Sequence, residues 1–184
     1  MQIISVINQK GGVGKTTTVI NLAAGLSQLN KKILVIDLDP QGNATTGLGL
    51  SNMNNSSDTI YSVLNGTKEI NEVVKNTQFE NLDIITSNVD LSGLEVETAD
   101  DSNRAFILKA KLASYLNNSR SSYDYVLIDC PPSLSLLTVM ALVSSDSLLV
   151  PLQTEFFALE GLTQLMKTIE RIKVNLNPDL KIRG

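Results

Sequence analysis

The chain has 184 residues, 42% of them hydrophobic, and a formal net charge of −4. It contains no histidine and one cysteine, Cys130, which excludes imidazole metal sites, histidine-based catalysis, an internal disulfide and a four-thiolate cluster within one chain. The acidic balance argues against a dominant basic face for a nucleic-acid backbone. We expect one domain over residues 1–184, whose chemistry uses carboxylates, lysines, hydroxyls, backbone amides and a bound ion.

Apolar runs alternate with stretches of helical spacing along the chain. The first run leads through a glycine-rich turn into a helix, and a second run follows after a short connection, which is typical of a right-handed βαβ unit. Such runs predict strands that are covered on both faces. The pattern therefore predicts an α/β fold, a doubly wound and mostly parallel sheet with helices on both faces. Strands are predicted at residues 3–7, 33–36, 82–86, 123–129 and 147–152, with a sixth beginning at residues 180–184.

Helices are predicted between these strands. Asp58 is expected to cap a short helix, and the last helix is amphipathic and should pack its apolar stripe into the core. Residues 51–58 are expected to form a surface loop. The predicted helices cover residues 16–29, 60–64, 91–99, 103–118, 134–143 and 155–177. The predicted buried face of the helix over 103–118 consists of Phe106, Ile107, Ala110, Ala113 and Leu116.

The two ends of the sequence carry weaker signals. The start has no features of a leader and no apolar run approaches the length of a membrane span, so we expect a cytoplasmic protein. A domain does not normally stop on the first residues of a central strand. We therefore expect a partial chain, with a sheet that is incomplete at the C-terminus.

The strongest functional signal lies between the first predicted strand and the first predicted helix. Gly11, Gly12 and Gly14 allow backbone conformations closed to other residues, so successive N–H groups can converge on a phosphate at the positive end of the helix. Lys15 adds a mobile positive charge, and the Thr16 hydroxyl can bind a magnesium ion held by the phosphates. The predicted phosphate-binding residues are Lys10, Gly11, Gly12, Val13, Gly14, Lys15, Thr16 and Thr17.

Asp37, Asp39 and Asp129 are predicted at the carboxyl ends of strands, where ligands bind in open α/β sheets. The apolar run before Asp129 is the Walker B arrangement, in which a strand delivers an acid that holds magnesium through a water. Asp37 and Asp39 are expected to point the same way, which favours a shared cation or water, and Asp39 would orient the attacking water. The predicted catalytic residues are Lys10, Lys15, Asp39 and Asp129, and the predicted metal ligands are Thr16, Asp37 and Asp129.

Two residues depart from the ordinary P-loop pattern G-x-x-x-x-G-K-[ST]. Gln9 stands where its first glycine falls, and Lys10 precedes the glycine pair. The resulting pattern, K-G-G-x-G-K-T, resembles the deviant Walker A ATPases, which include the ParA/Soj partition proteins, the MinD cell-division regulators and the nitrogenase iron protein. The resemblance implies an ATP-dependent homodimer in which Lys10 reaches the partner's nucleotide. On residue type alone, a solvated loop lysine stays the alternative.

Four longer stretches resemble the ParA/Soj branch in order and spacing, and together they span the chain. By position, Gly11 and Gly12 belong to the loop that closes on ATP at the dimer interface, Asp39 to the first switch and Asp129 to the second. The resemblance implies a P-loop NTPase fold, of which the chain would be about the N-terminal two thirds. The stretches are N-Q-K-G-G-V-G-K-T-T-T, V-I-D-L-D-P-Q-G-N-A-T, Y-D-Y-V-L-I-D-C-P-P-S-L and Q-T-E-F-F-A-L-E-G-L.

The same resemblance implies a function in chromosome or plasmid partitioning. The ATP- and Mg²⁺-bound dimer would coat nucleoid DNA without sequence preference, and a ParB-type partner would stimulate a slow ATPase and release the dimer. No membrane is involved. The residues that grip DNA, and much of the adenine pocket, would follow residue 184.

Three alternatives are weaker. A MinD-like membrane-cycling regulator needs a C-terminal amphipathic helix, and the stretch Q-T-E-F-F-A-L-E-G-L favours the partition branch instead. The iron–sulfur branch needs two cysteines per subunit, and the chain has only Cys130. A small-molecule P-loop kinase needs an acceptor pocket and usually a lid with arginines, and no such lid stands out.

Overall fold

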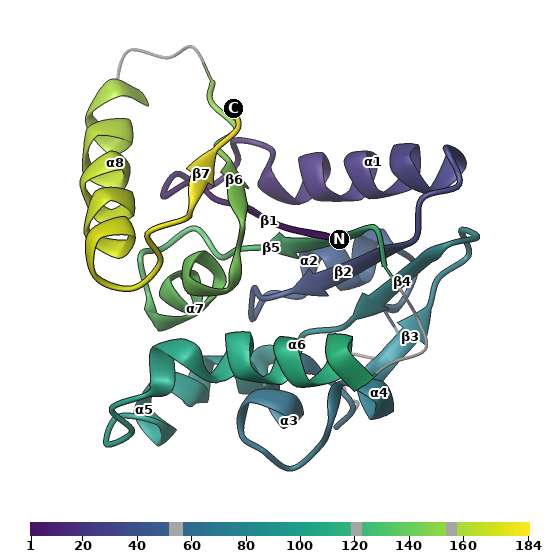
Figure 1. Ribbon diagram of the computed structural model, residues 1–184. Helices are drawn as coiled ribbons and strands as arrows, with labels where there is room; N and C mark the ends of the chain where they lie inside the picture. Colours follow the sequence, from purple (N-terminus) through teal and green to yellow (C-terminus); the bar gives the residue numbers. More distant parts are fainter. Residues whose placement is uncertain (52–56, 119–122, 154–157) are drawn as a thin grey trace.

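A seven-stranded sheet with helices on both faces forms the centre of the structure, a computed structural model that describes residues 1–51, 57–118, 123–153 and 158–184 (Figure 1). The strand order is β3-β4-β2-β5-β1-β6-β7, and the pairs are parallel except β3 with β4. The strands are β1 (Gln2–Val6), β2 (Ile33–Asp37), β3 (Val74–Asn76), β4 (Leu82–Ile85), β5 (Tyr125–Asp129), β6 (Ser147–Leu149) and β7 (Lys181–Ile182). The predicted α/β, P-loop-type sheet is thereby confirmed.

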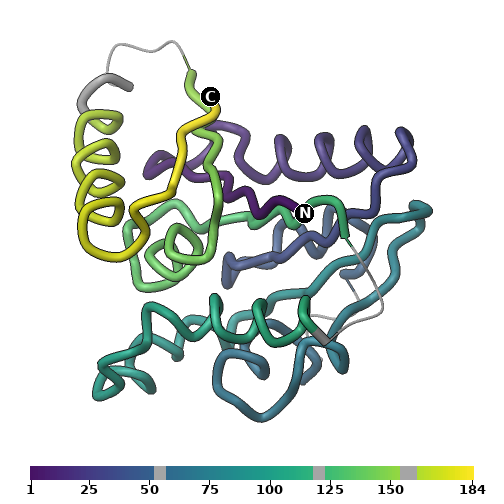
Figure 2. Tube along the Cα trace, in the orientation of Figure 1, coloured from purple at the N-terminus to yellow at the C-terminus, as the bar shows by residue number. Residues whose placement is uncertain are grey.

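The helices follow the strands along the chain. In the tube of Figure 2, the last strand lies beside β6, as the strand order requires. The helices are α1 (Lys15–Gln28), α2 (Asn43–Gly47), α3 (Ile60–Leu64), α4 (Ile70–Val73), α5 (Leu94–Glu97), α6 (Ile107–Asn118), α7 (Leu136–Ser144) and α8 (Ala158–Asn175). Two 3₁₀ segments, η2 (Val89–Gly93) and η3 (Arg104–Phe106), precede α5 and α6. No helix among these described residues is long and apolar enough to cross a membrane.

The core consists of two apolar layers, one on each face of the sheet. On β2, Ile33 and Val35 pack into the layer that contains Val19 of α1, whereas Leu34 and Ile36 pack into the layer that contains α6, α7 and α8. Side chains alternate between the faces of a strand, so each central strand must be apolar on both sides. Figure 1 shows the same division, with α1 on one side of the sheet and α6 on the other.

This alternation fixes where the strand-end carboxylates lie. Asp37 ends β2 and Asp129 ends β5, and the two residues are paired in register, with Val6 of β1 on the other side of Asp129. Leu127 belongs to the α1 layer, so Asp129, two residues later, points to the α1 face. Asp37 follows Val35 in the same way. Both acids therefore lie at the carboxyl edge of the sheet, on the side where α1 begins.

Some predicted elements differ from the structure. Each of the predicted strands has a counterpart, but β3 was not predicted, because three residues with one hydrophobic side chain give no periodic signal. The short helices α2 and α4 were not predicted either. Part of the predicted loop at 51–58 and the first residues of the last predicted helix lie outside the described residues. The core role of the last helix is confirmed for Leu165, Ile169 and Ile172, which are buried.

The predicted buried face of α6 was wrong in part, although two of its five residues, Ile107 and Leu116, are partly buried and pack against the core. Leu108 and Leu112 are buried, whereas Ala110 and Ala113 are exposed and Phe106 is 36% exposed. Leu108 and Leu112 are separated by one helical turn, so they form one ridge toward the core. Alanine gave an ambiguous signal because its small side chain fits either face.

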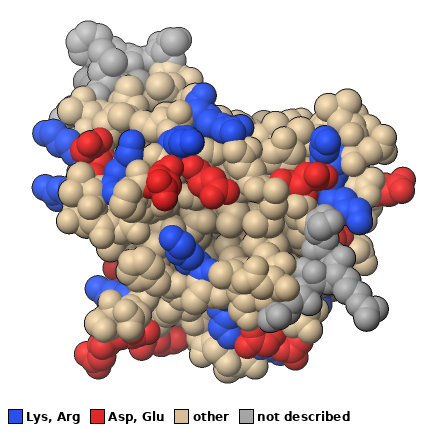
Figure 3. All heavy atoms as spheres, viewed as in Figure 1, with Lys and Arg blue, Asp and Glu red and all other residues tan. Residues whose placement is uncertain are grey.

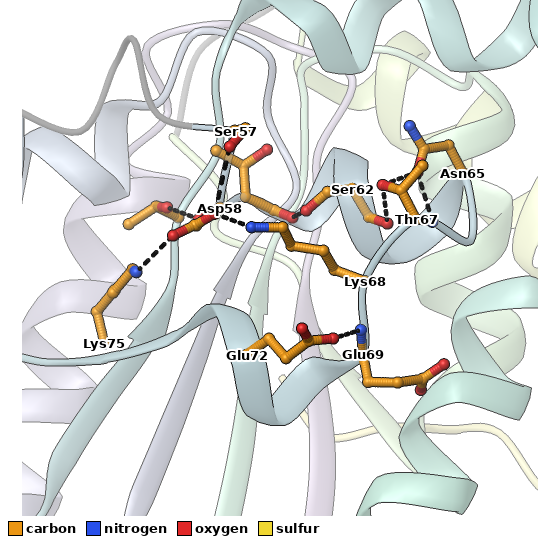
Figure 4. A network of polar contacts seen from close by, with 11 residues as sticks. Ser57, Asp58, Ser62, Asn65, Thr67, Lys68, Glu69, Glu72 and Lys75 are labelled. Atoms are coloured by element: carbon orange, nitrogen blue, oxygen red, sulfur yellow. Dashed lines mark hydrogen bonds and ion pairs between the residues drawn. The ribbon is translucent and has the colours of Figure 1, made fainter.

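The predicted cap at Asp58 was also wrong. The residue before α3 is Thr59, and it makes no side-chain cap hydrogen bond. The Asp58 carboxylate instead forms ion pairs with Lys68 and with Lys75 of β3, the latter at 3.3 Å (Figure 4). Its bonds to Lys68 and Lys75 hold the pKa of Asp58 below its ordinary value. Through Asp58, which precedes α3, these ion pairs connect the edge strand β3 to Lys68 in the segment after α3.

Charged side chains of both signs lie intermingled on the face shown in Figure 3. Neither sign of charge forms a continuous patch on this face.

Leu112 of α6 and Phe106 of η3 test which side of this helical segment packs into the core. We expect Leu112→Ala to lower the free energy of unfolding by about 3 kcal/mol, because it removes buried methyl groups and leaves a cavity. Phe106→Ala should cost about 1 kcal/mol, because its ring is partly in water already. Urea unfolding followed by circular dichroism measures both. Equal losses, or a larger loss for Phe106→Ala, would contradict the observed face.

Candidate nucleotide-binding site

The glycine-rich loop connects the end of β1 to the start of α1. Gly12 (φ 75°) and Gly14 (φ 90°) have left-handed backbone conformations, which side chains with a Cβ rarely adopt. Gly14 precedes α1 directly, and its carbonyl accepts the amide hydrogen bond of Thr18 at 2.8 Å. The N–H groups of the first helical turn have no partner within the helix, so they are available to an anion.

A hollow of about 410 Å³ lies over this loop. Its lining consists mainly of loop backbone and small polar side chains, which suits a polyphosphate better than an apolar ligand. The lining residues are Gly11, Gly12, Gly14, Lys15, Thr16, Thr17, Asn43 and Pro132. Pro132 follows Asp129 in the stretch that the resemblance assigns to the second switch, whereas Asn43 from α2 was not predicted, since its place beside the loop depends on how the strands are ordered.

Lys15 is folded back against the loop that carries it. Its side chain is only 7% exposed, and Nζ donates a hydrogen bond to the carbonyl oxygen of Lys10 at 3.1 Å. Burial lowers the pKa of Lys15, and the negative charges of Asp129 and Asp39 oppose that shift. The ammonium group is therefore held near the acids and the loop, where it can meet a phosphate.

Asp129 is the acid at the end of β5. It is fully buried, and neither carboxylate oxygen has a hydrogen-bond partner within the described part of the chain. Burial raises the pKa of Asp129 to about 7; the neighbouring Thr16 hydroxyl opposes the shift, and the charges of Asp37 and Asp39 add to it. Two unpartnered, hard oxygen acceptors next to a hydroxyl fit a magnesium ion.

The protein supplies only part of such an ion's coordination. The described residues contain no group of three or more histidine, cysteine, aspartate or glutamate side chains that could hold a metal. Magnesium commonly takes one or two protein ligands and completes its shell with waters and phosphate oxygens. The donor set of Thr16 and Asp129 fits an ion that arrives with a nucleotide.

Asp37 differs from Asp129 in that its carboxylate is already bonded. Oδ2 accepts hydrogen bonds from the amide and the hydroxyl of Thr45, both at 2.7 Å, and Oδ1 accepts from the amide of Asp39 at 3.2 Å. Burial raises the pKa of Asp37 to about 6, and the bonds from Thr45 oppose the shift. The structure thus shows Asp37 holding its own loop, and the metal role of Asp37 stays a prediction.

Asp39 lies in the loop between β2 and α2. Its side chain is 6% exposed, and Oδ1 accepts a hydrogen bond from the amide of Gln41 at 3.0 Å. The charge of Asp39 acts on Lys15 and on Asp129. The structure therefore brings together Lys15, Asp39 and Asp129 from three segments that are far apart in the sequence.

Lys10 is exposed, unlike Lys15, and its amide donates to Asn8 Oδ1 at 3.0 Å. Two side chains that were not predicted hold this part of the loop. Asn8 Nδ2 donates to the carbonyl of Pro151 at 2.7 Å, and Gln153 Nε2 donates to the carbonyl of Gly12 at 3.1 Å. These two roles were not predicted, because the carbonyl groups that accept the bonds from Asn8 Nδ2 and Gln153 Nε2 lie 143 and 141 positions away in the sequence.

Comparisons with known proteins identify the family. A family model described as an AAA domain matches residues 1–182. The chromosome partitioning protein ParA of Caulobacter vibrioides is 48% identical over 184 residues, which cover 100% of this chain and 68% of that protein. The chain belongs to the ParA/Soj family. The sporulation initiation inhibitor protein Soj of Bacillus subtilis is 45% identical over 183 residues, covering 100% of this chain and 70% of that relative.

A solved structure adds the ligands that a neighbour binds. Cobyrinic acid a,c-diamide synthase from Mycobacterium smegmatis, crystallised with an ATP analogue and magnesium, matches with a TM-score of 0.91 and 37% identity, over 99% of this chain and 72% of that one. The predicted cofactors, ATP and Mg²⁺, agree with those ligands. That neighbour is named for a different reaction, so the shared fold alone does not select the function.

The unpartnered carboxylate of Asp129 gives the second prediction. We expect Asp129→Asn to raise the melting temperature of the ligand-free protein, because a neutral amide replaces a buried charge of nearly the same shape. The same variant should lose most of the thermal stabilisation that magnesium and a non-hydrolysable ATP analogue give the wild type.

Differential scanning fluorimetry with and without both ligands measures the two effects. Asp100→Asn, at an exposed position, serves as the control and should behave as the wild type. An unchanged stabilisation by nucleotide and magnesium in Asp129→Asn would contradict the placement of the ion.

Proposed function

We propose that this chain is the nucleotide-binding part of an ATP-dependent partition switch. It binds ATP with Mg²⁺, hydrolyses the nucleotide slowly, and changes its association with itself and with other molecules between the two nucleotide states. The observation that carries the proposal is the buried carboxylate of Asp129, which has no hydrogen-bond partner among the described residues and lies near Thr16 and Lys15 of the glycine-rich loop. The high identity to ParA and Soj proteins supports partitioning as the process.

Each part of the site has a distinct role in binding. The amides of Gly12 to Thr17 surround the phosphates, and the Lys15 ammonium neutralises their charge. Thr16 and Asp129 would hold the magnesium ion, Asp129 through a water. When bound, the ion neutralises charge on the phosphate oxygens. The dry, buried position of Asp129 strengthens these interactions, because the local dielectric constant is low.

Asp39 orients the attacking water in this proposal. The terminal phosphoryl group passes to water, so no covalent bond to the protein forms, and the protein contributes position and charge. The bond from the amide of Gln41 to Asp39 Oδ1 limits how the carboxylate can turn. Burial lowers the pKa of Lys15, and the negative charge of Asp39 opposes that shift. This attraction couples the acid to the phosphate-binding loop.

Lys10 is the residue proposed to contact a second copy of the chain. It is exposed on the phosphate-binding loop, and we propose that it contacts the nucleotide of a second copy, so that ATP joins two chains. A ParB-type protein would then stimulate turnover and release the dimer from DNA. The net charge of −4 argues that this segment is not the main DNA-binding surface. We place the contacts to DNA in the part of longer family members that follows this segment, and the protein in the cytoplasm on the nucleoid.

Replacement of Asp39 tests the hydrolytic role. We expect Asp39→Ala to lower phosphate release by about 10²-fold or more, because the water loses the group that orients it. The ATP-dependent dimer should persist, since the phosphate-binding groups are untouched. A phosphate-release assay and light scattering measure the two properties, with the exposed Asp100→Ala as the control. Turnover equal to that of the wild type would exclude this role for Asp39.

Replacement of Lys10 tests the dimer contact separately from binding. We expect Lys10→Ala to bind a non-hydrolysable ATP analogue within about twofold of the wild type but to weaken nucleotide-dependent dimerisation by about tenfold or more. Isothermal calorimetry and sedimentation measure the two constants. Lys31→Ala, at an exposed lysine beyond the other end of α1, is the matched control. Equal losses of binding and dimerisation would place Lys10 on the nucleotide of its own chain.

A further inference from the structure

Three buried polar residues link separate segments beside the proposed site. Asp37 ends β2, Thr45 lies on α2, and Ser87 follows β4, and each is 0% exposed. A buried polar group destabilises the fold unless it forms hydrogen bonds, so the bonds among these residues restrict where their segments can lie.

Thr45 is at the centre of this group. Its hydroxyl donates to Asp37 Oδ2 at 2.7 Å and accepts the amide hydrogen bond of Ser87 at 3.0 Å. Its own amide donates to the same Asp37 oxygen at 2.7 Å. One side chain thus connects the ends of two neighbouring strands, because β2 and β4 pair directly, with Ile36 opposite Ile85.

These bonds close the loop that carries Asp39. The amide of Asp39, at the start of the loop, and the amide of Thr45, at its end, both donate to the carboxylate of Asp37. Inside the loop, the amide of Gly42 donates to the carbonyl of Asp39 at 2.9 Å. The loop is therefore a ring around one buried carboxylate, and the bond to Ser87 fixes that ring to the sheet.

We propose that Thr45 is a positioning residue for hydrolysis, which sets the place of Asp39 relative to the terminal phosphate. The inference rests on the proposed ATPase function. Thr45 does not line the hollow over the phosphate-binding loop, so it acts through Asp37 and the ring. Valine in its place would keep the shape but leave a carboxylate oxygen with one bond fewer and the amide of Ser87 without its acceptor.

The test uses substitutions that separate the hydroxyl from the side-chain volume. Thr45→Val removes the hydroxyl, and Thr45→Ser retains it. Thr46→Val makes the same change at the next position of α2, where the side chain is exposed. For each protein, kcat and KM for ATP hydrolysis, nucleotide affinity by calorimetry, and amide hydrogen exchange of the ligand-free chain are measured.

We expect Thr45→Val to lower kcat by about tenfold or more, with nucleotide affinity within about twofold of the wild type. Exchange at the amides of Asp39, Thr45 and Ser87 should rise in the same variant. Thr45→Ser should recover most of kcat and the slow exchange, and Thr46→Val should behave as the wild type.

Two results would overturn the inference. One is a normal kcat in Thr45→Val, even if its melting temperature falls, because the bonds would then serve stability alone. The other is an equal loss of nucleotide affinity and kcat, which would indicate general damage to the site. If the wild type itself binds no nucleotide and shows no turnover, the proposed function fails. Unchanged amide hydrogen exchange in Thr45→Val would separately show that the Thr45 hydroxyl does not hold the loop around Asp37.

Discussion

A carboxylate that finds no hydrogen-bond partner in the described part of the chain is buried where three strands end, and the other parts of the site surround it. Asp129 lies between the ends of β1 and β2, with its charge in the interior. Such a group destabilises the ligand-free fold unless it binds a proton or a cation. The proposed ligand brings a cation together with phosphates that the adjacent amides and Lys15 can bind. Ligand binding therefore relieves a cost that the fold itself creates, and this couples the nucleotide to local stability.

The sheet also explains why two neighbouring acids serve different purposes. Asp37 and Asp129 are in register on adjacent strands and share the α1 face, so both meet the same low dielectric and repel each other. The carboxylate of Asp37 is bonded to Thr45 and to the backbone of its own loop, which makes it part of the structure. Asp129 has no such bonds and remains available. The bonds of Asp37 hold the loop of Asp39 in place, and a contact of Asp37 with the proposed ion stays a prediction.

The sequence predicted those features whose signals are local. Apolar runs predicted the central strands, and the glycines with Lys15 and Thr16 predicted the phosphate-binding loop, because conformation and charge are set there by adjacent residues. Features that depend on distant partners were missed or misassigned. The carboxylate of Asp58 bonds to Lys68 and Lys75 instead of capping α3, and the hydroxyl of Thr45 meets Ser87, 42 positions later. No periodicity records such contacts, since the strand order brings them together.

A nucleotide switch must transmit a difference of one phosphate to surfaces that do not touch it. Only groups near the terminal phosphate can respond directly, and in the proposed site these would belong to the segments after β2 and β5. The amide of Leu38, the first residue after β2, donates at 2.9 Å to the carbonyl of Asp129, the last residue of β5, so a backbone bond joins the chain where the two segments begin. Pro40 and Pro131, one from each segment, also line a common hollow with Leu91 of η2. In the proposed switch, a displacement of either segment would therefore reach the same surface beside η2.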